Sequence, residues 1–104
     1  MLTFTETDAR QKIDLPVGEE AELVLPENRL AGFHWEIEES GKPVVTVEDR
    51  GTAPPDSPVG GANTRRLRIQ AVEPGTATVR LRHRRSWEPP NSGRTVSFIF
   101  QVSR

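Results

Sequence analysis

The sequence contains no cysteine, so a disulfide framework, a thiolate metal site and a cysteine nucleophile are all excluded. It has two histidines, His34 and His83, which are too few for a metal site built from several imidazoles. No pair of carboxylates stands out as an acid and base, so the sequence shows no arrangement of nucleophile and base. We therefore expect no catalytic residue, no metal, no cofactor and no enzymatic activity.

Long apolar runs are also absent, and none approaches the roughly 20 residues that a membrane-spanning helix needs. The first residues, Met1-Leu2-Thr3-Phe4, do not open like a signal peptide. We expect a soluble, monomeric protein without a membrane partner, cytoplasmic unless an export signal has been removed. A chain of 104 residues can bury one modest core, so we expect a single domain over residues 1–104.

What the sequence does contain is apolar residues that alternate with polar ones, and no stretch reads as a long amphipathic helix. The predicted strands are 3–5, 12–15, 20–25, 33–38, 44–48, 65–71, 76–84 and a final strand after Gly93. Pro26 is predicted to end the third of these. Arg50 to Asn63 is rich in Gly and Pro, and an irregular segment of this length is usually functional or disordered.

Seven or eight short strands with turn residues between them are typical of an all-β, antiparallel, immunoglobulin-like β-sandwich. No helix is available as a crossover for a parallel sheet. Trp35 is predicted to lie in the core, because it stands within an alternating strand. Phe33 and Ile37 are predicted to share its face, since they lie two residues away on either side.

The charges are divided unevenly, although the net charge is only −1. Residues 1–50 carry 12 acidic and 5 basic residues, whereas residues 51–104 carry 3 acidic and 9 basic residues. An immunoglobulin-like strand order would set Glu20 and Glu22 beside the arginines of 65–68. It would also set Glu36 and Glu38 beside Arg80 and Arg82. Opposite charges across a sheet contribute roughly 0.2–1 kcal/mol per pair and discourage slipped registers.

A basic second half also raises the alternative of nucleic-acid binding, which would use the run from Arg80 to Arg85. The alternation places Leu81 and His83 on the opposite face from the arginines, and no stripe of exposed aromatic residues accompanies them. We therefore expect no nucleic-acid partner.

Three segments are candidates for recognition: 28–34, 58–63 and 85–90. By the strand order above, the first and the last project from the same end of a sandwich, and the glycine-rich segment between them could reach that end as well. Loops that leave a rigid scaffold at fixed points are suited to binding a partner.

These segments give the chain a resemblance to the chagasin family, small inhibitors of papain-like cysteine proteases. Members carry, in order, a loop Asn-Pro-Thr-Thr-Gly-Phe/Tyr-x-Trp, a loop Gly-x-Gly-Gly and a loop Arg-Pro-Trp/Phe. This chain has Asn28-Arg29-Leu30-Ala31-Gly32-Phe33-His34-Trp35, then Pro58-Val59-Gly60-Gly61, then Arg85-Ser86-Trp87. The order, the spacing and the strands between the motifs also fit.

The resemblance implies reversible, non-covalent inhibition, in which three loops occlude the active-site cleft of a papain-like cysteine protease. The first loop would lie over the catalytic cysteine, and the outer two would hold the walls of the cleft. The protease-binding residues that it implies are Asn28, Arg29, Leu30, Ala31, Gly32, Phe33, Val59, Gly60, Gly61, Arg85, Ser86 and Trp87.

Several positions depart from the family pattern. Leu30 and Ala31 replace the threonine pair, so the tip of the first loop offers apolar groups in place of two hydroxyls. Arg29 replaces a proline, which removes some preorganisation from that loop. Pro58 stands in place of a glycine, and Ser86 replaces the proline of the third motif. The alternative function is an immunoglobulin-like adhesion or structural module without inhibitory activity, for which none of these loops would matter.

Overall fold

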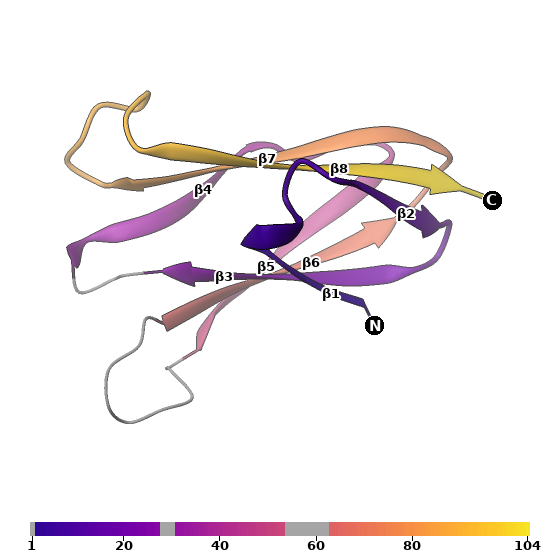
Figure 1. Ribbon diagram of the computed structural model, residues 1–104, viewed down its shortest axis with the longest axis horizontal. Helices are drawn as coiled ribbons and strands as arrows, with labels where there is room; N and C mark the ends of the chain where they lie inside the picture. The colour runs from indigo at the N-terminus through magenta and orange to yellow at the C-terminus, as the bar shows by residue number, and fades with distance from the viewer. Residues whose placement is uncertain (1, 28–30, 54–62) are drawn as a thin grey trace.

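The computed structural model describes residues 2–27, 31–53 and 63–104, which form two four-stranded sheets stacked as a sandwich (Figure 1). One sheet has the order β1-β3-β6-β5, with β1 at Leu2–Thr5, β3 at Glu20–Glu27, β5 at Val45–Ala53 and β6 at Asn63–Ala71. The other has the order β2-β8-β7-β4, with β2 at Lys12–Pro16, β4 at Phe33–Glu39, β7 at Gly75–Arg85 and β8 at Arg94–Ser103. A short 3-10 helix, η1, spans Glu6–Asp8. The predicted immunoglobulin-like sandwich of seven or eight strands is confirmed, with eight strands in the described residues.

The core lies between the sheets and follows the period-two pattern of the sequence. In β8 the predicted inward face is confirmed, because Phe98 and Phe100 are fully buried and Val96 and Val102 nearly so. The opposite sheet contributes inward-facing leucines and an isoleucine, namely Leu23, Leu25, Leu67 and Ile69. Burying this apolar surface is the main favourable contribution to folding.

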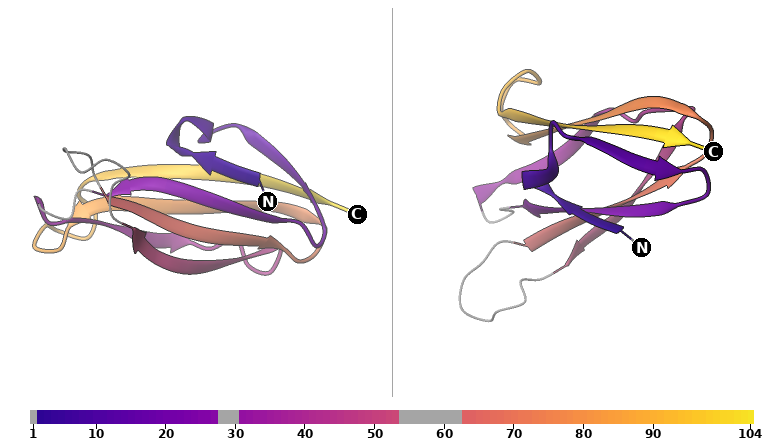
Figure 2. Two further views of the ribbon diagram at one scale, coloured as in Figure 1. Left: turned by 90° about the horizontal axis from the view of Figure 1, so that it is seen from below. Right: turned by 45° about the vertical axis from the view of Figure 1, so that its right-hand side comes forward.

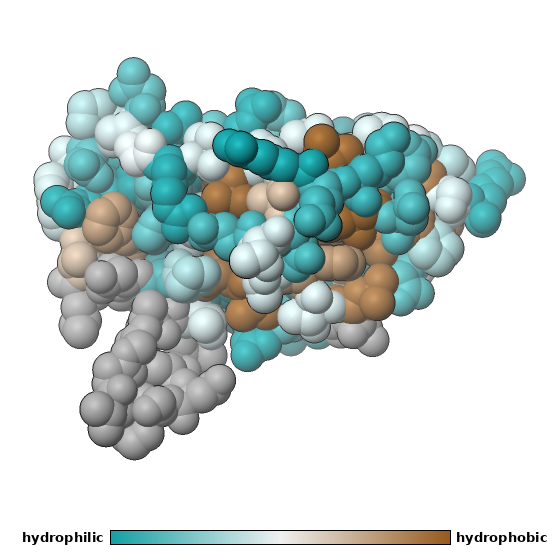
Figure 3. Space-filling view, viewed as in Figure 1, coloured by the Kyte–Doolittle hydropathy of each residue, from teal (hydrophilic) through white to brown (hydrophobic). Residues whose placement is uncertain are grey.

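Two sheet edges differ from the purely antiparallel pairing that the sequence predicted. β1 pairs with β3 in parallel, and β2 pairs with β8 in parallel. After β1 the chain crosses through η1 to the other sheet, forms β2 there and returns as β3 (Figure 2). Because β2 lies in the opposite sheet, β1 and β3 can run in parallel without a helical crossover. Figure 3 shows the molecule from the side on which β1, η1 and β2 lie. Apolar residues, in brown, appear there mainly away from the loop end.

Three local predictions were wrong. β3 does not end at Pro26 but continues to Glu27, because β1 stops opposite Val24 and a proline is tolerated where a strand has lost one neighbour. β5 extends to Ala53, since a register irregularity between Asp49 and Thr52 lets pairing with β6 resume. Ile37 is 43% exposed, because β4 is the edge strand of its sheet.

The predicted charge pairs are confirmed between β3 and β6, and between β4 and β7 the prediction is confirmed for Glu38 with Arg82, whereas Glu36 pairs with Arg84 and Arg80 with Glu39. The outer face of β3 and β6 carries Glu22 with Arg66 and Glu20 with Arg68, at 2.5 and 3.8 Å. The outer face of β4 and β7 carries Glu36 with Arg84, Glu38 with Arg82 and Glu39 with Arg80. Acidic strands of the first half of the chain, β3 and β4, thus pair with basic strands of the second half, β6 and β7.

Within the described residues, no helix has the length and apolar character that crossing a bilayer requires.

Candidate functional site

The strand ends that carry the three recognition segments lie at one end of the sandwich, at the left in Figure 1. Glu27, where β3 ends, pairs with Asn63, where β6 begins. Phe33, where β4 begins, pairs with Arg85, where β7 ends. Six of the predicted site residues lie outside the described residues: Asn28, Arg29, Leu30, Val59, Gly60 and Gly61. The other six are Ala31, Gly32, Phe33, Arg85, Ser86 and Trp87, and the structure places all of them at this end.

Trp87 lies directly against Gly32, which brings the first and third motifs into contact. A Cβ atom at Gly32 would sit 2.3 Å from Cη2 and 2.6 Å from Cζ3 of the indole, closer than any real contact. Gly32 also has a φ of +85°, a conformation that side chains disfavour. The indole is nevertheless 69% exposed, so one part of it rests on the first motif and the rest faces solvent.

A hydrogen-bonded turn fixes the position of Trp87 in the chain. The backbone N–H of Glu88 donates to the carbonyl of Arg85 at 3.1 Å, which closes a four-residue turn with Trp87 in its third position. The Glu88 carboxylate in turn accepts from the backbone N–H of Arg85 at 2.8 Å. Ser86 and Trp87 are therefore presented at the tip of a closed turn.

A column of stacked side chains lies beneath the first and third motifs, on the side of the sandwich body. The Arg85 guanidinium lies 4.7 Å from the centre of the Phe33 ring, and Phe33 stacks on His83 with 4.8 Å between ring centres. His83 stacks on Trp35 at 4.5 Å, and the Arg94 guanidinium lies 5.3 Å from the Trp35 ring. Arg85 and Phe33 thus contact each other within the chain, and the base of the third motif rests on the base of the first.

Burial lowers the pKa of His83, and the nearby positive charge of Arg94 lowers it further, while Glu27 and Glu6 oppose the shift. Nε2 of His83 is buried and has no hydrogen-bond partner among the residues described. The imidazole is therefore held in its neutral form, as a flat ring between Phe33 and Trp35.

Sequence reasoning missed the buried ion pair that joins the segments. Glu27 is fully buried, and its carboxylate accepts from the Trp35 backbone N–H at 3.1 Å and from Nε and Nη2 of Arg65, both at 3.0 Å. Arg65 also reaches Asp49 at 2.9 Å, and its hydrogen bonds with Glu27 raise its pKa. Extending the alternation of Ala21, Leu23 and Leu25 by two residues would have placed Glu27 inward and so signalled this pair.

This ion pair links the ends of three strands. Glu27 is the last residue of β3, Arg65 lies near the start of β6, and Trp35 lies near the start of β4. The Trp35 indole N–H adds a bond of 2.8 Å to the carbonyl of Pro26. The strand ends that flank 28–30 and the strand that follows 54–62 are therefore tied together.

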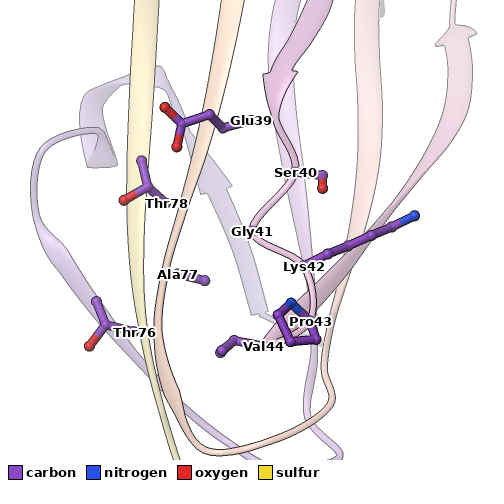
Figure 4. Close-up of a pocket in the computed structure, with 9 residues that line it drawn as sticks. All are labelled: Glu39, Ser40, Gly41, Lys42, Pro43, Val44, Thr76, Ala77 and Thr78. Carbon is purple, nitrogen blue, oxygen red and sulfur yellow. The ribbon is translucent and has the colours of Figure 1, made fainter.

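A pocket at the opposite end of the sandwich is separate from this site. It lies between the turn that joins β4 to β5 and the first residues of β7, and its lining includes Glu39, Lys42, Thr76 and Thr78 (Figure 4). It contains none of the predicted site residues. No group of three His, Asp or Glu side chains in the described parts of the chain is placed to hold a metal ion.

A sandwich in which the strand ends flanking three recognition segments lie at one end, with Trp87 against Gly32, is the arrangement of a binding protein of the immunoglobulin-like class. Residues 14–102 match the family model described as "Chagasin family peptidase inhibitor I42", and the chain belongs to this family. The predicted family is therefore confirmed, and the chain is a peptidase inhibitor rather than an enzyme.

Its relatives include chagasin from Trypanosoma cruzi, which is 30% identical over an alignment covering 76% of each chain. Among solved structures, the cysteine protease inhibitor EhICP2 from Entamoeba histolytica has a TM-score of 0.81 at 17% identity, covering 98% of this chain and 94% of that one. Amebosin has a TM-score of 0.73 at 27% identity, covering 98% and 97%. PbICP-C, in complex with falcipain-2, has a TM-score of 0.71 at 15% identity, covering 99% and 100%.

Proposed function

We propose that this chain inhibits papain-like cysteine proteases reversibly, by filling the active-site cleft with the loops at one end of its sandwich. The chagasin family assignment supports inhibition of a peptidase. Two proteins of the same fold point to the class of target: one is described as a cysteine protease inhibitor, and the other was solved in complex with falcipain-2. The partner is thus a papain-like cysteine protease.

The observation that carries this proposal is the contact between Trp87 and Gly32. This contact joins two segments that are distant in sequence, and two joined segments can block a groove that neither would block alone. The sandwich and the Glu27–Arg65 pair hold the described strand ends in place, so these strand ends need no ordering on binding.

The chemistry of this end suits occlusion without a covalent bond. The exposed part of the Trp87 indole offers a large, rigid apolar surface with one N–H donor, which is a common kind of interface hot spot. Ala31, which precedes Gly32 in the chain, is exposed, and its side chain is only a methyl group. The chain has no cysteine with which to exchange a disulfide with the catalytic thiol.

Titration against papain or a cathepsin tests the proposal, with Trp87→Ala and Gly61→Glu as variants. We expect competitive inhibition by the parent chain and a loss of about 2 kcal/mol or more of binding free energy for Trp87→Ala. Gly61→Glu should also weaken inhibition, because a side chain would hold the partner backbone away. Val72→Ala removes an exposed apolar side chain outside the recognition segments and should leave inhibition unchanged.

Absence of inhibition against several such proteases would contradict the proposal and would favour a binding module without inhibitory activity.

A further inference from the structure

Three arginines on the outer face of β7 look equivalent in the sequence, and each pairs with a carboxylate of β4. Arg80 reaches Glu39 at 2.5 Å, Arg82 reaches Glu38, and Arg84 reaches Glu36 through Nε at 2.7 Å and Nη2 at 2.9 Å. In addition to its ion pair, Arg80 contacts the Ser97 hydroxyl of the neighbouring strand at 3.5 Å. The three arginines differ in the partners of the guanidinium nitrogens that do not bond a carboxylate of β4.

Nη1 of Arg84 donates to the backbone of the turn that presents Trp87. Its acceptors are the carbonyls of Glu88 at 2.8 Å, Arg85 at 3.1 Å and, more weakly, Ser86 at 3.5 Å. These carbonyls lie on both sides of Trp87 in the sequence. The side chain of Arg84 is only 13% exposed, so these bonds are made largely out of water.

Arg82 supports the part of the loop between β7 and β8 that lies nearer to β8. Its Nη1 donates to the carbonyls of Asn91 at 3.1 Å and Ser92 at 3.0 Å. The loop therefore rests on two guanidinium groups, and Arg84 supports the half of it that carries Trp87.

Glu36 holds the Arg84 guanidinium in orientation. Two parallel bonds to one carboxylate fix the plane of the fork, and this leaves Nη1 directed at the loop. The bond from Arg84 holds the pKa of Glu36 below its ordinary value, so this carboxylate stays ionised at neutral pH. Nε2 of His34, a residue of the first motif, lies 3.3 Å from Oε2 of Glu36, the oxygen that also accepts from Nη2 of Arg84.

We propose that Arg84, held by Glu36, is a positioning residue for the loop of residues 86–93, the third loop. It keeps this loop closed and holds the Trp87 indole against Gly32 before the protease binds. This inference rests on the proposed function, and it adds a requirement that the sequence motif does not contain. A lysine would keep the positive charge at this position. It could not bond the carboxylate with two nitrogens and the loop carbonyls with a third.

The test compares Arg84→Gln and Arg84→Lys with Arg80→Gln, which removes an arginine that pairs with β4 on the same face but contacts no carbonyl of the loop. Two quantities are measured on each full-length chain. The first is the NMR chemical shift of the Gly32 Hα protons in the free protein, which the adjacent indole ring displaces. The second is the inhibition constant against papain.

We expect both Arg84 variants to move the Gly32 Hα shifts toward their random-coil positions. They should weaken inhibition by about tenfold or more, because binding would then have to order the loop. Arg80→Gln should change neither quantity. Circular dichroism and thermal unfolding confirm that each variant is folded, and Arg84→Lys, which keeps the charge, serves as the milder change.

Unchanged Gly32 shifts in both folded Arg84 variants would overturn the inference, as would weaker inhibition without any movement of those shifts. The Gly32 signal is read without a protease. A parent chain that inhibits no papain-like protease would therefore contradict the proposed function. The Gly32 shifts would still test whether Arg84 holds Trp87 against Gly32.

Discussion

At the scale of single residues, Gly32 meets two separate requirements. Its backbone is left-handed, and its missing side chain leaves the space that the Trp87 indole occupies. Gly18 has a similar φ of +91° but has no atom near the position of a Cβ. The two glycines therefore separate the cost of backbone strain from the loss of the Trp87 contact.

We predict that Gly32→Ala and Gly18→Ala each lower the free energy of unfolding by about 1–2 kcal/mol, the cost of a left-handed residue with a side chain. Only Gly32→Ala should also weaken inhibition, because its methyl group displaces Trp87. Urea denaturation and the inhibition constant against papain check the two parts. Equal inhibition by both variants would show that the contact has no role in binding.

His83 gives the stability of the protein a predictable dependence on pH. In the unfolded chain its pKa is near the ordinary value of 6.5, and in the folded chain burial lowers it. As the pH falls below 6.5, the unfolded chain takes up a proton that the folded chain does not. The free energy of unfolding should therefore decrease from pH 6.5 downward, until the folded pKa is reached.

Urea denaturation between neutral pH and about pH 5 measures this slope, and His83→Phe provides the comparison, because it keeps a flat ring between Phe33 and Trp35 but cannot bind a proton. The variant should lose the part of the slope that lies just below pH 6.5. Identical slopes for the two proteins would contradict the assignment.

At the scale of strands, the Glu27–Arg65 pair should matter far more than its neighbour on the same two strands. Breaking a buried pair costs about 3–5 kcal/mol, since one charge is left buried without its partner. Pairs with one solvent-exposed partner, such as Glu22 with Arg66, are usually worth less than about 1 kcal/mol. The difference follows from burial, because Glu27 is fully buried whereas the Arg66 side chain is 44% exposed.

Double-mutant cycles test this with Glu27→Gln and Arg65→Gln against Glu22→Gln and Arg66→Gln. We predict a coupling energy well above 1 kcal/mol for the first pair and below about 1 kcal/mol for the second. Comparable coupling in the two cycles would mean that Glu27 and Arg65 do not hold these strand ends.

The strands themselves could be predicted because burial on one face imposes a period of two on the sequence. The errors arose where pairing, rather than composition, decided the outcome. Pro26 belongs to β3 because the neighbouring strand has already ended, and Ile37 is exposed because β4 lies at an edge. Neither fact can be read from a strand in isolation.

At the scale of the whole molecule, the order of three motifs was enough to identify the family and the end of the sandwich that carries them. The contacts between the motifs could not be predicted, because they join residues far apart in the sequence. Trp87 meets Gly32, and Glu27 meets Arg65 across β3 and β6. The roles of Leu30, Gly60 and Gly61 stay predictions from the sequence.

The opposite charges of the two halves serve to align strands. Arg80, Arg82 and Arg84, which suggested nucleic-acid binding in the sequence, are each paired with a glutamate of β4. Two of these arginines also hold carbonyls of the third loop, so the same residues that fix the sheet register also support the binding end.

Hydrogen–deuterium exchange of the chain alone and bound to papain with a free active-site cleft tests most directly whether the loop end forms the inhibitory surface. Backbone amides of Ala31 to Phe33 and of Ser86 to Glu88 should become protected together, while those of Ser40 to Val44 at the opposite end should not change. Protection confined to the opposite end, or to only one of the two loop segments, would contradict the account.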